Sequence, residues 1–374
     1  MNVIEVDTRN PAQVKEFLTL PFRLYRNTPQ WVPPLAQDAR LQLDRQHFPY
    51  FQHSEAAFFL VYGGEKKDAI GRIAVLEPRL YNQYNRERTA FFYLFECEDN
   101  QAAALALFET AFHWARRRNL DHLLGPKGFT ALDGHGLLVQ GFDHRPALGI
   151  PYNPVYYANL IEAAGFHTEF ETVSGYLDAA APFPEHIHRA AQVIQKRRGL
   201  KITTFHSRKE LRPLVARLKD LYNGALSGTR YNAPITDAEA KTMADQILWF
   251  ADPKLIKIIT KDDEPVGFLL AYPDISAALQ RCQGRLLPFG WADVLLEFRR
   301  TNWININGAG MVEKYRGQGG PAVLFSEMYK SVAESSYRFA DLVQIGTENE
   351  AMQRELRDIG IDFYKKHRVY NRPL

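Results

Sequence analysis

The feature that most constrains this chain is a glycine-rich turn between an expected strand and an expected helix. Apolar residues over 303–309 predict a strand, and residues 323–329 predict the start of a helix. The turn between them, residues 315–322, contains three glycines and an arginine. Glycine lets the backbone approach a ligand closely, and the free N–H groups at a helix N-terminus attract anions. The sequence therefore predicts a phosphate-holding turn, although its spacing matches neither a P-loop nor the dinucleotide fingerprint.

Composition limits the classes of protein to consider. The 374 residues correspond to about two domains, and 46% hydrophobic residues are enough for two cores. A net charge of +3 is too small to favour a nucleic-acid partner, and no apolar run is long enough to span a membrane. The cysteines, Cys97 and Cys282, have no metal-site spacing. We expect a reduced, cytoplasmic protein with neither a membrane nor a nucleic-acid partner.

Hydrophobic periodicity predicts the same order of elements twice. In each half a strand is followed by two helices, three strands, a helix, a strand, a helix and a strand, which indicates a mixed α/β sheet. Two capping boxes, Ser207 with Glu210 and Thr236 with Glu239, support helix starts in the second half. The expected strands cover residues 3–6, 56–62, 69–76, 89–95, 120–124, 170–177, 200–205, 255–261, 266–271, 303–312, 342–345 and 364–371. The expected helices cover residues 11–26, 35–46, 102–118, 155–164, 184–198, 207–226, 236–249, 275–281, 321–338 and 348–359. We predict two tandem domains, residues 1–195 and 196–374.

The second half resembles the GNAT acyltransferases. In that family the central turn reads Gln/Arg-x-x-Gly-x-Gly/Ala, and Arg316, Gly319 and Ala322 are the nearest matches, with Pro321 where Gly or Ala is usual. Asn349 stands about thirty residues later and begins an expected helix, as in the family. The first half is similar only in element order and in the end of the helix before Gly165. The whole chain resembles two-domain GNAT-like proteins of bacteria.

The resemblance implies two tandem GNAT-like domains and an acetyl-CoA or other acyl-CoA cofactor. In the family the turn holds the cofactor's pyrophosphate, and the strand before it splays from its neighbour to cradle the pantetheine arm. The cofactor-binding residues implied are Met311, Val312, Arg316, Gly317, Gln318, Gly319, Gly320, Ala322 and Asn349.

The match has gaps that bear on activity. Many GNAT enzymes carry a proton-donating tyrosine in the final helix, where this chain has Leu356, and the first half has Ile161 at the equivalent place. Residues 98–102 replace the phosphate turn in the first half, without glycine and with added negative charge. We therefore expect only the second half to bind a CoA-type cofactor.

Catalytic candidates are few. A transferase that uses an amine needs a base, yet no carboxylate lies on the expected strand over 303–311. Glu313 and Glu348 lie beside the turn and before the last helix, and Tyr364 and Tyr370 lie on the last strand. Of these, we retain Tyr364 and Glu313 as catalytic candidates. The alternative for Tyr364 is packing on its strand, and the alternative for Glu313 is a solvated or capping role.

Substrate-binding candidates gather near an insertion, residues 274–300. Asn305 and Asn307 alternate on one face of a strand where apolar residues would be expected. The insertion borders the acceptor cleft of the GNAT fold, which makes Tyr272, Asp274 and Arg285 candidates beside them. An extra packing helix explains the insertion equally well.

A long loop in the first half, residues 125–153, contains Lys127, Asp133 and His135 among many glycines. Loops of this length are usually functional. We therefore weigh a lid or substrate-binding role for the loop equally with a purely structural packing role. The Asp/His pair lacks a full ligand set, so we expect no metal.

The function we expect is transfer of an acyl group, with acetyl first, from CoA to a small-molecule or peptide amine. A GNAT fold that binds a ligand without turnover is the first alternative, favoured by Leu356. Transfer from an aminoacyl-tRNA is the second, although the modest charge argues against it. The assembly is left open, with a homodimer as one alternative.

Overall fold

A computed structural model describes residues 1–64, 68–130, 133–229 and 231–374. The chain forms two compact units, each built from more than one segment. Unit 1 comprises residues 1–173, 276–295 and 365–374, and unit 2 comprises residues 174–275 and 296–364. The predicted boundary between residues 195 and 196 divides the chain once. In the structure, residues 276–295 and 365–374 of the second half belong to unit 1. That boundary remains a prediction about sequence domains.

Unit 1 contains a mixed sheet. Its strands are β1 (Asn2–Glu5), β2 (Glu55–Tyr62), β3 (Ala69–Glu77), β4 (Thr89–Cys97), β5 (His122–Gly125), β6 (Leu137–Gln140), and the parts of β7 (His167–Asp178) and β13 (Asp362–Pro373) that belong to this unit. The order β1-β2-β3-β4-β5-β13 is antiparallel except for the parallel pair β4 and β5, and β6 also pairs with β13.

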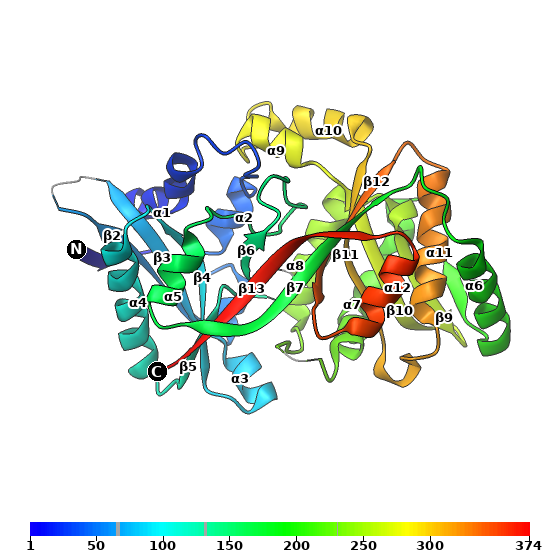
Figure 1. Cartoon of the computed structure of the whole chain (residues 1–374), viewed down its shortest axis with the longest axis horizontal. Coiled ribbons are helices and arrows are strands. Elements are labelled where there is room, and N and C mark those ends of the chain that lie inside the picture. The colour runs from blue at the N-terminus through cyan, green and yellow to red at the C-terminus, as the bar shows by residue number, and fades with distance from the viewer. Residues whose placement is uncertain (65–67, 131–132, 230) are drawn as a thin grey trace. The chain divides into compact units, whose positions relative to one another are not determined.

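The helices of unit 1 are α1 (Pro11–Leu24), α2 (Ala36–Leu41), the short 3-10 helix η1 (Pro49–Gln52), α3 (Arg79–Asn85), α4 (Gln101–Arg116), α5 (Tyr157–Ala163), α9 (Ser276–Cys282) and the first half of α10 (Gly290–Arg300). Helix α4 packs on β2 and β3 (Figure 1). Its apolar face is buried, because Leu107, Phe108, Ala111 and Phe112 follow helical spacing.

Unit 2 likewise combines parallel and antiparallel strands with helices. Its strands are β8 (Lys201–Thr203), β9 (Ile256–Lys261), β10 (Glu264–Pro273), β11 (Trp303–Met311) and β12 (Phe339–Gly346), with its parts of β7 and β13. The order is β7-β12-β11-β10-β9-β8, with β11 and β12 parallel. The helices are α6 (Glu185–Arg198), α7 (Arg208–Leu226), α8 (Asp237–Phe250), α11 (Gly320–Ala333) and α12 (Glu350–Asp358), with the 3-10 turns η2 (Pro253–Leu255) and η3 (Glu313–Tyr315).

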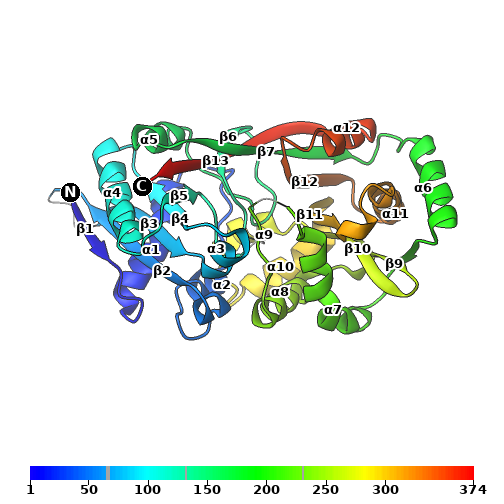
Figure 2. The same cartoon turned by 90° about the horizontal axis from the view of Figure 1, so that it is seen from below.

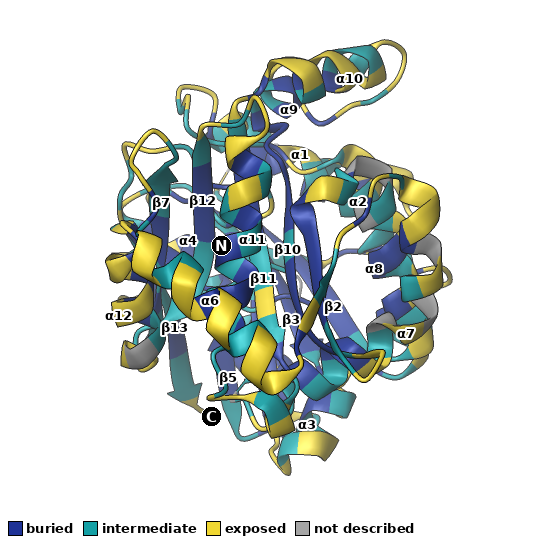
Figure 3. Cartoon of the chain, turned by 90° about the vertical axis from the view of Figure 1, so that its right-hand side faces the viewer, coloured by how far each residue is buried: buried dark blue, intermediate teal, exposed yellow. Residues whose placement is uncertain are grey.

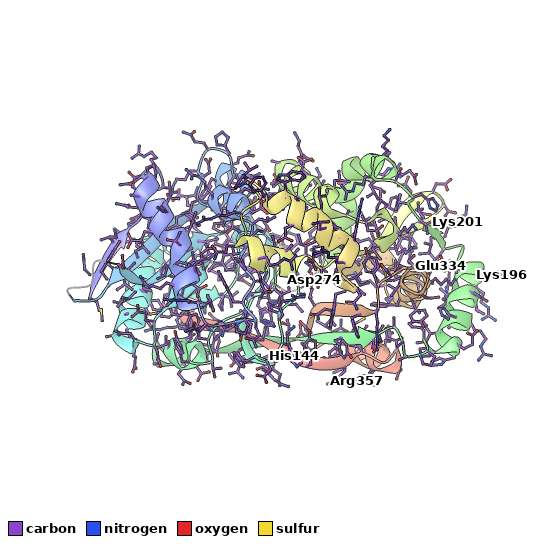
Figure 4. All side chains as sticks on the ribbon, turned by 90° about the horizontal axis from the view of Figure 1, so that it is seen from above. His144, Lys196, Lys201, Asp274, Glu334 and Arg357 are labelled. Carbon is purple, nitrogen blue, oxygen red and sulfur yellow. The ribbon has the colours of Figure 1, made fainter. Side chains whose placement is uncertain are left out.

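Helix α6 lies against α11 (Figure 2). The ring of Phe183 stacks on Tyr329 at 4.7 Å, and the His188 ring nitrogen lies 2.8 Å from the Ser326 hydroxyl. The opposite face of α6 is exposed and includes Lys196 (Figures 3 and 4). One face of α6 therefore covers α11, and His188 on this face is half-buried against Tyr329.

Most expected elements are present within a few residues of their predicted bounds. Three were missed: α3, β6 and α10. Helix α2 ends at Leu41 rather than near residue 46. The capping box at Thr236 is formed in both directions, by Thr236 N–H to Glu239 at 2.8 Å and Glu239 N–H to the Thr236 hydroxyl at 3.2 Å. No helix within the described ranges has the length and apolar character needed to cross a membrane.

Candidate functional site

The parallel strands β11 and β12 separate halfway along their length in unit 2. Their pairing runs from Trp303 opposite Phe339 to Ile306 opposite Leu342, and among the described residues it goes no further. Strand β11 continues to Met311 along β10 alone, with a register shift opposite Leu269 and Ala271. The last residues of β11 thus have backbone groups on one side that β12 does not use. This is the splay that the family resemblance predicts.

The glycine-rich turn joins the free end of β11 to α11. Gly317 has φ +69° and Gly319 has φ +82°, a left-handed conformation that glycine adopts without strain. Within the described chain, the backbone N–H groups of Gly317, Gln318 and Gly319 have no hydrogen-bond acceptor. Since α11 begins here and is 14 residues long, its dipole adds to these donors. The turn can therefore receive an anion.

Close packing explains two of the glycines as well. A Cβ on Gly319 would lie 2.5 Å from Ile194 of α6, and one on Gly320 would lie 2.5 Å from the Met311 sulfur. Met311 is a core residue beneath the turn. By contrast, a Cβ on Gly317 would have nothing within 4 Å. A side chain at position 317 would therefore meet no other atom of the described chain within 4 Å of its Cβ.

Arg316 connects the turn to the end of α7. Its guanidinium donates to the carbonyl oxygens of Met311 at 3.2 Å, Ala225 at 2.9 Å and Ser227 at 2.6 Å. Gln318 donates to the carbonyl of Lys314 at 3.0 Å. Both side chains brace the turn, and contact of either with a cofactor stays a prediction.

The other predicted cofactor residues have structural duties too. The Val312 N–H donates to Val266 at 2.9 Å, and Ala322 lies half-buried in the first turn of α11. The Asn349 side chain accepts from the Met352 N–H at 3.2 Å and so caps α12. Leu356, at the position of the family tyrosine, is 1% exposed in the core of unit 2. It cannot donate a proton.

A buried polar cluster lies on the sheet where β11 and β12 begin to separate. Asn305 on β11 pairs in register with Tyr272 on β10 and with Asp341 on β12, so all three side chains are on one face. Asn305 and Asp341 are 1% and 3% exposed. The Tyr364 hydroxyl on β13 donates to Asp341 Oδ2 at 2.8 Å. The sheet thus holds a carboxylate and a phenol as a hydrogen-bonded pair.

Two asparagines complete the cluster. Asn307 donates to the Tyr272 hydroxyl at 2.6 Å, whereas Asn305 Nδ2 is buried with no partner in the described part of the chain. A buried donor without a partner is costly, and it suggests a site for a further acceptor. Burial raises the pKa of Tyr272 well above its usual range, and the charges of Asp274 and Asp341 add to this effect.

The structure separates the remaining candidates. Asp274 follows β10, is 5% exposed, and its N–H donates to Trp303 at 3.0 Å (Figure 4). Glu313 is exposed in η3 and accepts from the Ser227 hydroxyl at 3.3 Å, with no interaction with Tyr364 among the described residues. Arg285 belongs to unit 1, where its side chain is exposed. Neither Glu313 nor Arg285 is part of the cluster.

Asp341 is the residue that sequence reasoning missed. The available signal was a single carboxylate inside the apolar run over 339–345, next to the expected strand over 342–345. A buried acid in a strand is rare unless it is paired or functional.

The matching region of unit 1 is filled by its own chain. Strands β4 and β5 pair from Thr89 to Phe91. Beyond this pairing, the Lys127 N–H donates a hydrogen bond to the Phe92 carbonyl at 2.9 Å. At the end of β4, the Cys97 N–H donates to the Tyr157 hydroxyl, and the Cys97 carbonyl accepts from the Tyr156 hydroxyl, each at 2.8 Å. The backbone groups of Phe92 and Cys97 on this side of β4 therefore already have partners within unit 1.

A largely buried acidic side chain, that of Glu96, lies on this same strand. Glu96 accepts from the hydroxyls of Tyr25 and Tyr157 at 2.8 Å, and Arg72 lies 3.7 Å away. Burial raises the pKa of Glu96, which Arg72 and the two hydroxyls partly oppose. Ile161 is fully buried in the same core. These contacts fasten the elements of unit 1 together.

The loop over 125–153 is anchored rather than free. The Asn153 side chain accepts from the Leu138 N–H at 2.7 Å and donates to its carbonyl at 3.2 Å. Asp133 accepts from the Thr130 N–H at 2.7 Å, and burial lowers the pKa of Lys127 to about 8. Residues 131 and 132 lie outside the described ranges, and a substrate-binding role for the loop stays a prediction. The described residues contain no group of three or more His, Cys, Asp or Glu side chains arranged to hold a metal.

Two curated proteins match over nearly the whole chain. A protein named bacterial ceramide synthase from Caulobacter vibrioides is 28% identical, covering 100% of this chain and 98% of its own. Protein YghO from Escherichia coli is 24% identical, covering 98% of this chain and 94% of its own. No protein-family model matches.

Solved structures are similar at low identity. A tandem GNAT protein from the clavulanic acid biosynthesis pathway has a TM-score of 0.57 at 12% identity, covering 100% of this chain and 98% of its own. A GCN5-related N-acetyltransferase from Sphaerobacter thermophilus has a TM-score of 0.51 at 14% identity, covering 99% and 95%. At these identities the similarity shows the fold alone.

Proposed function

We propose that this chain, whose fold is that of tandem GNAT proteins, transfers an acyl group from an acyl-CoA to an amine. The observation that carries the proposal is the splay of β11 from β12 beside the buried pair of Asp341 and Tyr364. A groove for a thioester and a group able to take a proton are what amide formation from a thioester needs.

The turn before α11 fits the phosphates of CoA. The free N–H groups of Gly317, Gln318 and Gly319 are donors of the kind that bind phosphate at helix N-termini. When bound, acyl-CoA would supply the thioester carbonyl, whose C–S bond breaks as the new C–N bond forms. Among the described residues, this turn occurs in unit 2 alone, so we assign the cofactor to unit 2.

Asp341 and Tyr364 are our candidates for moving the proton of the amine. The phenolic oxygen of Tyr364 can accept a proton from the amine while its own proton passes to Asp341 Oδ2 along the existing 2.8 Å hydrogen bond. The same pair can return the proton to the departing thiolate. Asn305 Nδ2, which is buried without a partner in the described chain, can donate to a substrate oxygen. Glu313, by its position, is not part of this proposal.

The whole-length relative suggests the class of acceptor. Ceramide is an amide of a long-chain amino alcohol, and the relative that carries this name aligns over all of this chain. We therefore propose a lipid amine as acceptor and a fatty acyl group as donor, in place of a peptide amine and acetyl.

Binding without turnover is the second candidate. Leu356 occupies the position where the family carries its proton-donating tyrosine, and it is buried in the core. If neither Tyr364 nor Asp341 acts on a proton, the same groove would hold an acyl-CoA as a ligand. The aminoacyl-tRNA alternative has no supporting contact in the site.

Release of free thiol from acyl-CoA tests the two candidates. The purified chain is supplied with acetyl-CoA or palmitoyl-CoA and with a short amine or a long-chain amino alcohol. We expect thiol release with the long-chain pair, reduced about 100-fold or more in Asp341→Asn and in Tyr364→Phe. Calorimetric affinity for the acyl-CoA should stay within a factor of a few in both variants.

Tyr329→Phe is the matched control, because it removes a hydroxyl of unit 2 outside the cluster. Thiol release that is equal in Asp341→Asn and wild type would exclude the proton role. Tight acyl-CoA binding without thiol release from any amine would favour the binding protein. No binding of either acyl-CoA would overturn the proposal.

A further inference from the structure

Exposed apolar side chains concentrate in one short segment of the insertion. Of the nine large hydrophobic side chains that are exposed in the described chain, five fall between residues 287 and 296. Leu287 and Phe289, in the turn between α9 and α10, are 81% and 78% exposed. Trp291, Leu295 and Leu296 follow on α10 and are about half exposed. Leucine, phenylalanine and tryptophan together on one surface mark an interaction site more often than scattered single residues do.

The segment is held in this exposed position by hydrogen bonds. The Trp291 N–H donates to Leu286 at 2.8 Å, the Ala292 N–H donates to Phe289 at 3.0 Å, and the Trp291 ring N–H donates to Pro288 at 3.0 Å. Helix α10 also turns Val294 inward, where it is fully buried. The outward apolar side chains therefore belong to an ordered, amphipathic element (Figure 3).

The base of the segment is fastened to unit 1. The Ala36 N–H donates to the Gly284 carbonyl at 2.9 Å, and the Gln280 side chain donates to the carbonyls of Pro29 at 2.7 Å and Trp31 at 2.9 Å. A Cβ on Gly284 would collide with the Pro34 carbonyl. These contacts fix the base of the segment on unit 1, whereas the side chains of Leu287 and Phe289 are exposed.

The exposed charged side chains of residues 285–300 have one sign, because the two acidic side chains of this segment are paired or buried. Asp293 is paired with Arg281 at 2.8 Å, and Glu297 is buried at 8% exposure. Arg285, Arg299 and Arg300 are exposed, and none of them forms a salt bridge among the described residues. The segment thus presents leucine and aromatic side chains with exposed arginines, and its partly exposed carboxylate, Asp293, is paired with Arg281.

We propose that the tip formed by Leu287, Phe289, Trp291 and Leu295 docks on an anionic lipid surface. Aromatic and leucine side chains with arginines on the same element are suited to the boundary of a bilayer, where the apolar groups enter and the cations meet phosphates. The attachment is peripheral, through the side chains of one short helix and its turn. It departs from the expectation of no membrane partner, because exposure of these side chains is set by the tertiary structure. The inference does not depend on the proposed acyl transfer.

Vesicle flotation of the full chain tests the docking. Vesicles of phosphatidylcholine, with and without phosphatidylglycerol, are mixed with wild type and with Leu287→Ser/Phe289→Ser. We expect wild type to bind the anionic vesicles, with partitioning at least about tenfold weaker in the double variant. Arg285→Gln should weaken partitioning about fivefold on anionic vesicles and little on neutral ones.

Tyr84→Ser/Val193→Ser is the matched control, since both side chains are about half exposed and lie outside the tip. Its partitioning should equal that of wild type. Trp291 adds a second measurement: a blue shift of tryptophan emission on anionic vesicles that is lost in Trp291→Phe.

Three outcomes would overturn the docking. In the first, wild type does not bind to either type of vesicle. In the second, wild type and Leu287→Ser/Phe289→Ser partition equally. The third is self-association in light scattering that the double variant abolishes without any vesicle binding, which would assign the tip to a second copy of this chain. Flotation needs no turnover, so an inactive protein that binds vesicles would leave the docking standing and the acyl transfer refuted.

Discussion

Asp341 is a carboxylate that the sheet keeps almost completely out of water. A buried acid must be paired, bonded or neutral, and here the phenol of Tyr364 supplies a hydrogen bond at 2.8 Å. Its neighbour Asn305 keeps an amide donor buried without a partner in the described chain. Residues chosen for packing alone would be apolar at both positions, as Ile304 and Ile306 are on the other face.

Gly317 allows a test of whether the turn binds an anion, without disturbing the packing of the turn. Gly317→Asp places a negative charge beside the free N–H groups, and aspartate tolerates a φ of +69° better than most residues. We expect the Kd for acyl-CoA to rise about tenfold or more, because like charges repel at close range. Gly317→Asn has nearly the same shape and backbone tolerance, so calorimetry should show a much smaller change. Equal Kd values for the two variants would mean that no phosphate lies at the turn.

His367 predicts how unit 1 responds to acid. Its ring is fully buried, Nε2 lies 3.0 Å from the Pro151 carbonyl, and burial lowers its pKa to about 4. A depressed pKa means that the stabilising contribution is present above pH 6.5 and is lost as pH falls toward 4. From pH 7 to pH 5 the free energy of unfolding should fall by about 2 kcal/mol through this group.

Urea titrations at the two pH values check this prediction. In His367→Gln the fall between pH 7 and pH 5 should be smaller by about that amount, whereas exposed His186→Gln on α6 should behave as wild type. An unchanged fall in His367→Gln would show that other groups control the acid response.

At the scale of elements, the separation of β11 from β12 matters most. Four residue pairs join the strands, from Trp303 with Phe339 to Ile306 with Leu342. Beyond them β11 follows β10 through a bulge, and a bulge bends a strand away from its partner. The separation of β11 from β12 thus coincides with one irregularity in one strand.

Helix α12 gives a test at this scale through its cap. Asn349→Ala should lower the free energy of unfolding by about 1 kcal/mol, because the Met352 N–H loses its acceptor. Asn349→Asp keeps a capping oxygen and should retain stability in urea titrations. If the acyl-CoA Kd changes strongly in Asn349→Asp although stability does not, Asn349 contacts the cofactor in addition to capping the helix.

At the scale of the whole molecule, the two units have similar architecture and differ at the end of one strand. In unit 1 the Cys97 backbone is bound by Tyr156 and Tyr157, and Lys127 continues the pairing of β4. In unit 2 the corresponding backbone of β11 is open on the side of β12. In unit 1, side chains of the protein itself thus satisfy the backbone groups at the end of β4.

This difference predicts one acyl-CoA per chain. Calorimetric titration of wild type should reach a stoichiometry of one, and Gly317→Asp should weaken that same event without revealing a second. Tyr156→Phe, which removes a hydroxyl from the blocked strand of unit 1, should leave the stoichiometry unchanged. Two binding events per wild-type chain would refute the assignment of the cofactor to unit 2 alone.

The sequence by itself determined the order of most elements, the glycine-rich turn and its helix, and the absence of such a turn from residues 98–102 in the first half. These follow from local patterns: hydrophobic period, capping residues and glycine positions act over a few neighbouring residues. Leu356 and Ile161 were also identified as unable to donate a proton, and both are buried in cores.

Only the tertiary structure decided what meets at the site. Asp341, Asn305, Tyr272 and Tyr364 come from four strands, and strand register, which no local pattern specifies, places them together. The contacts of Arg316 were also decided by the tertiary structure. The sequence pattern assigned Arg316 to a phosphate, whereas in the structure its guanidinium donates to the carbonyls of Ala225 and Ser227 at the end of α7. Exposure at the tip of α10 is likewise a property of packing, because the same leucines would be core residues if another element covered them.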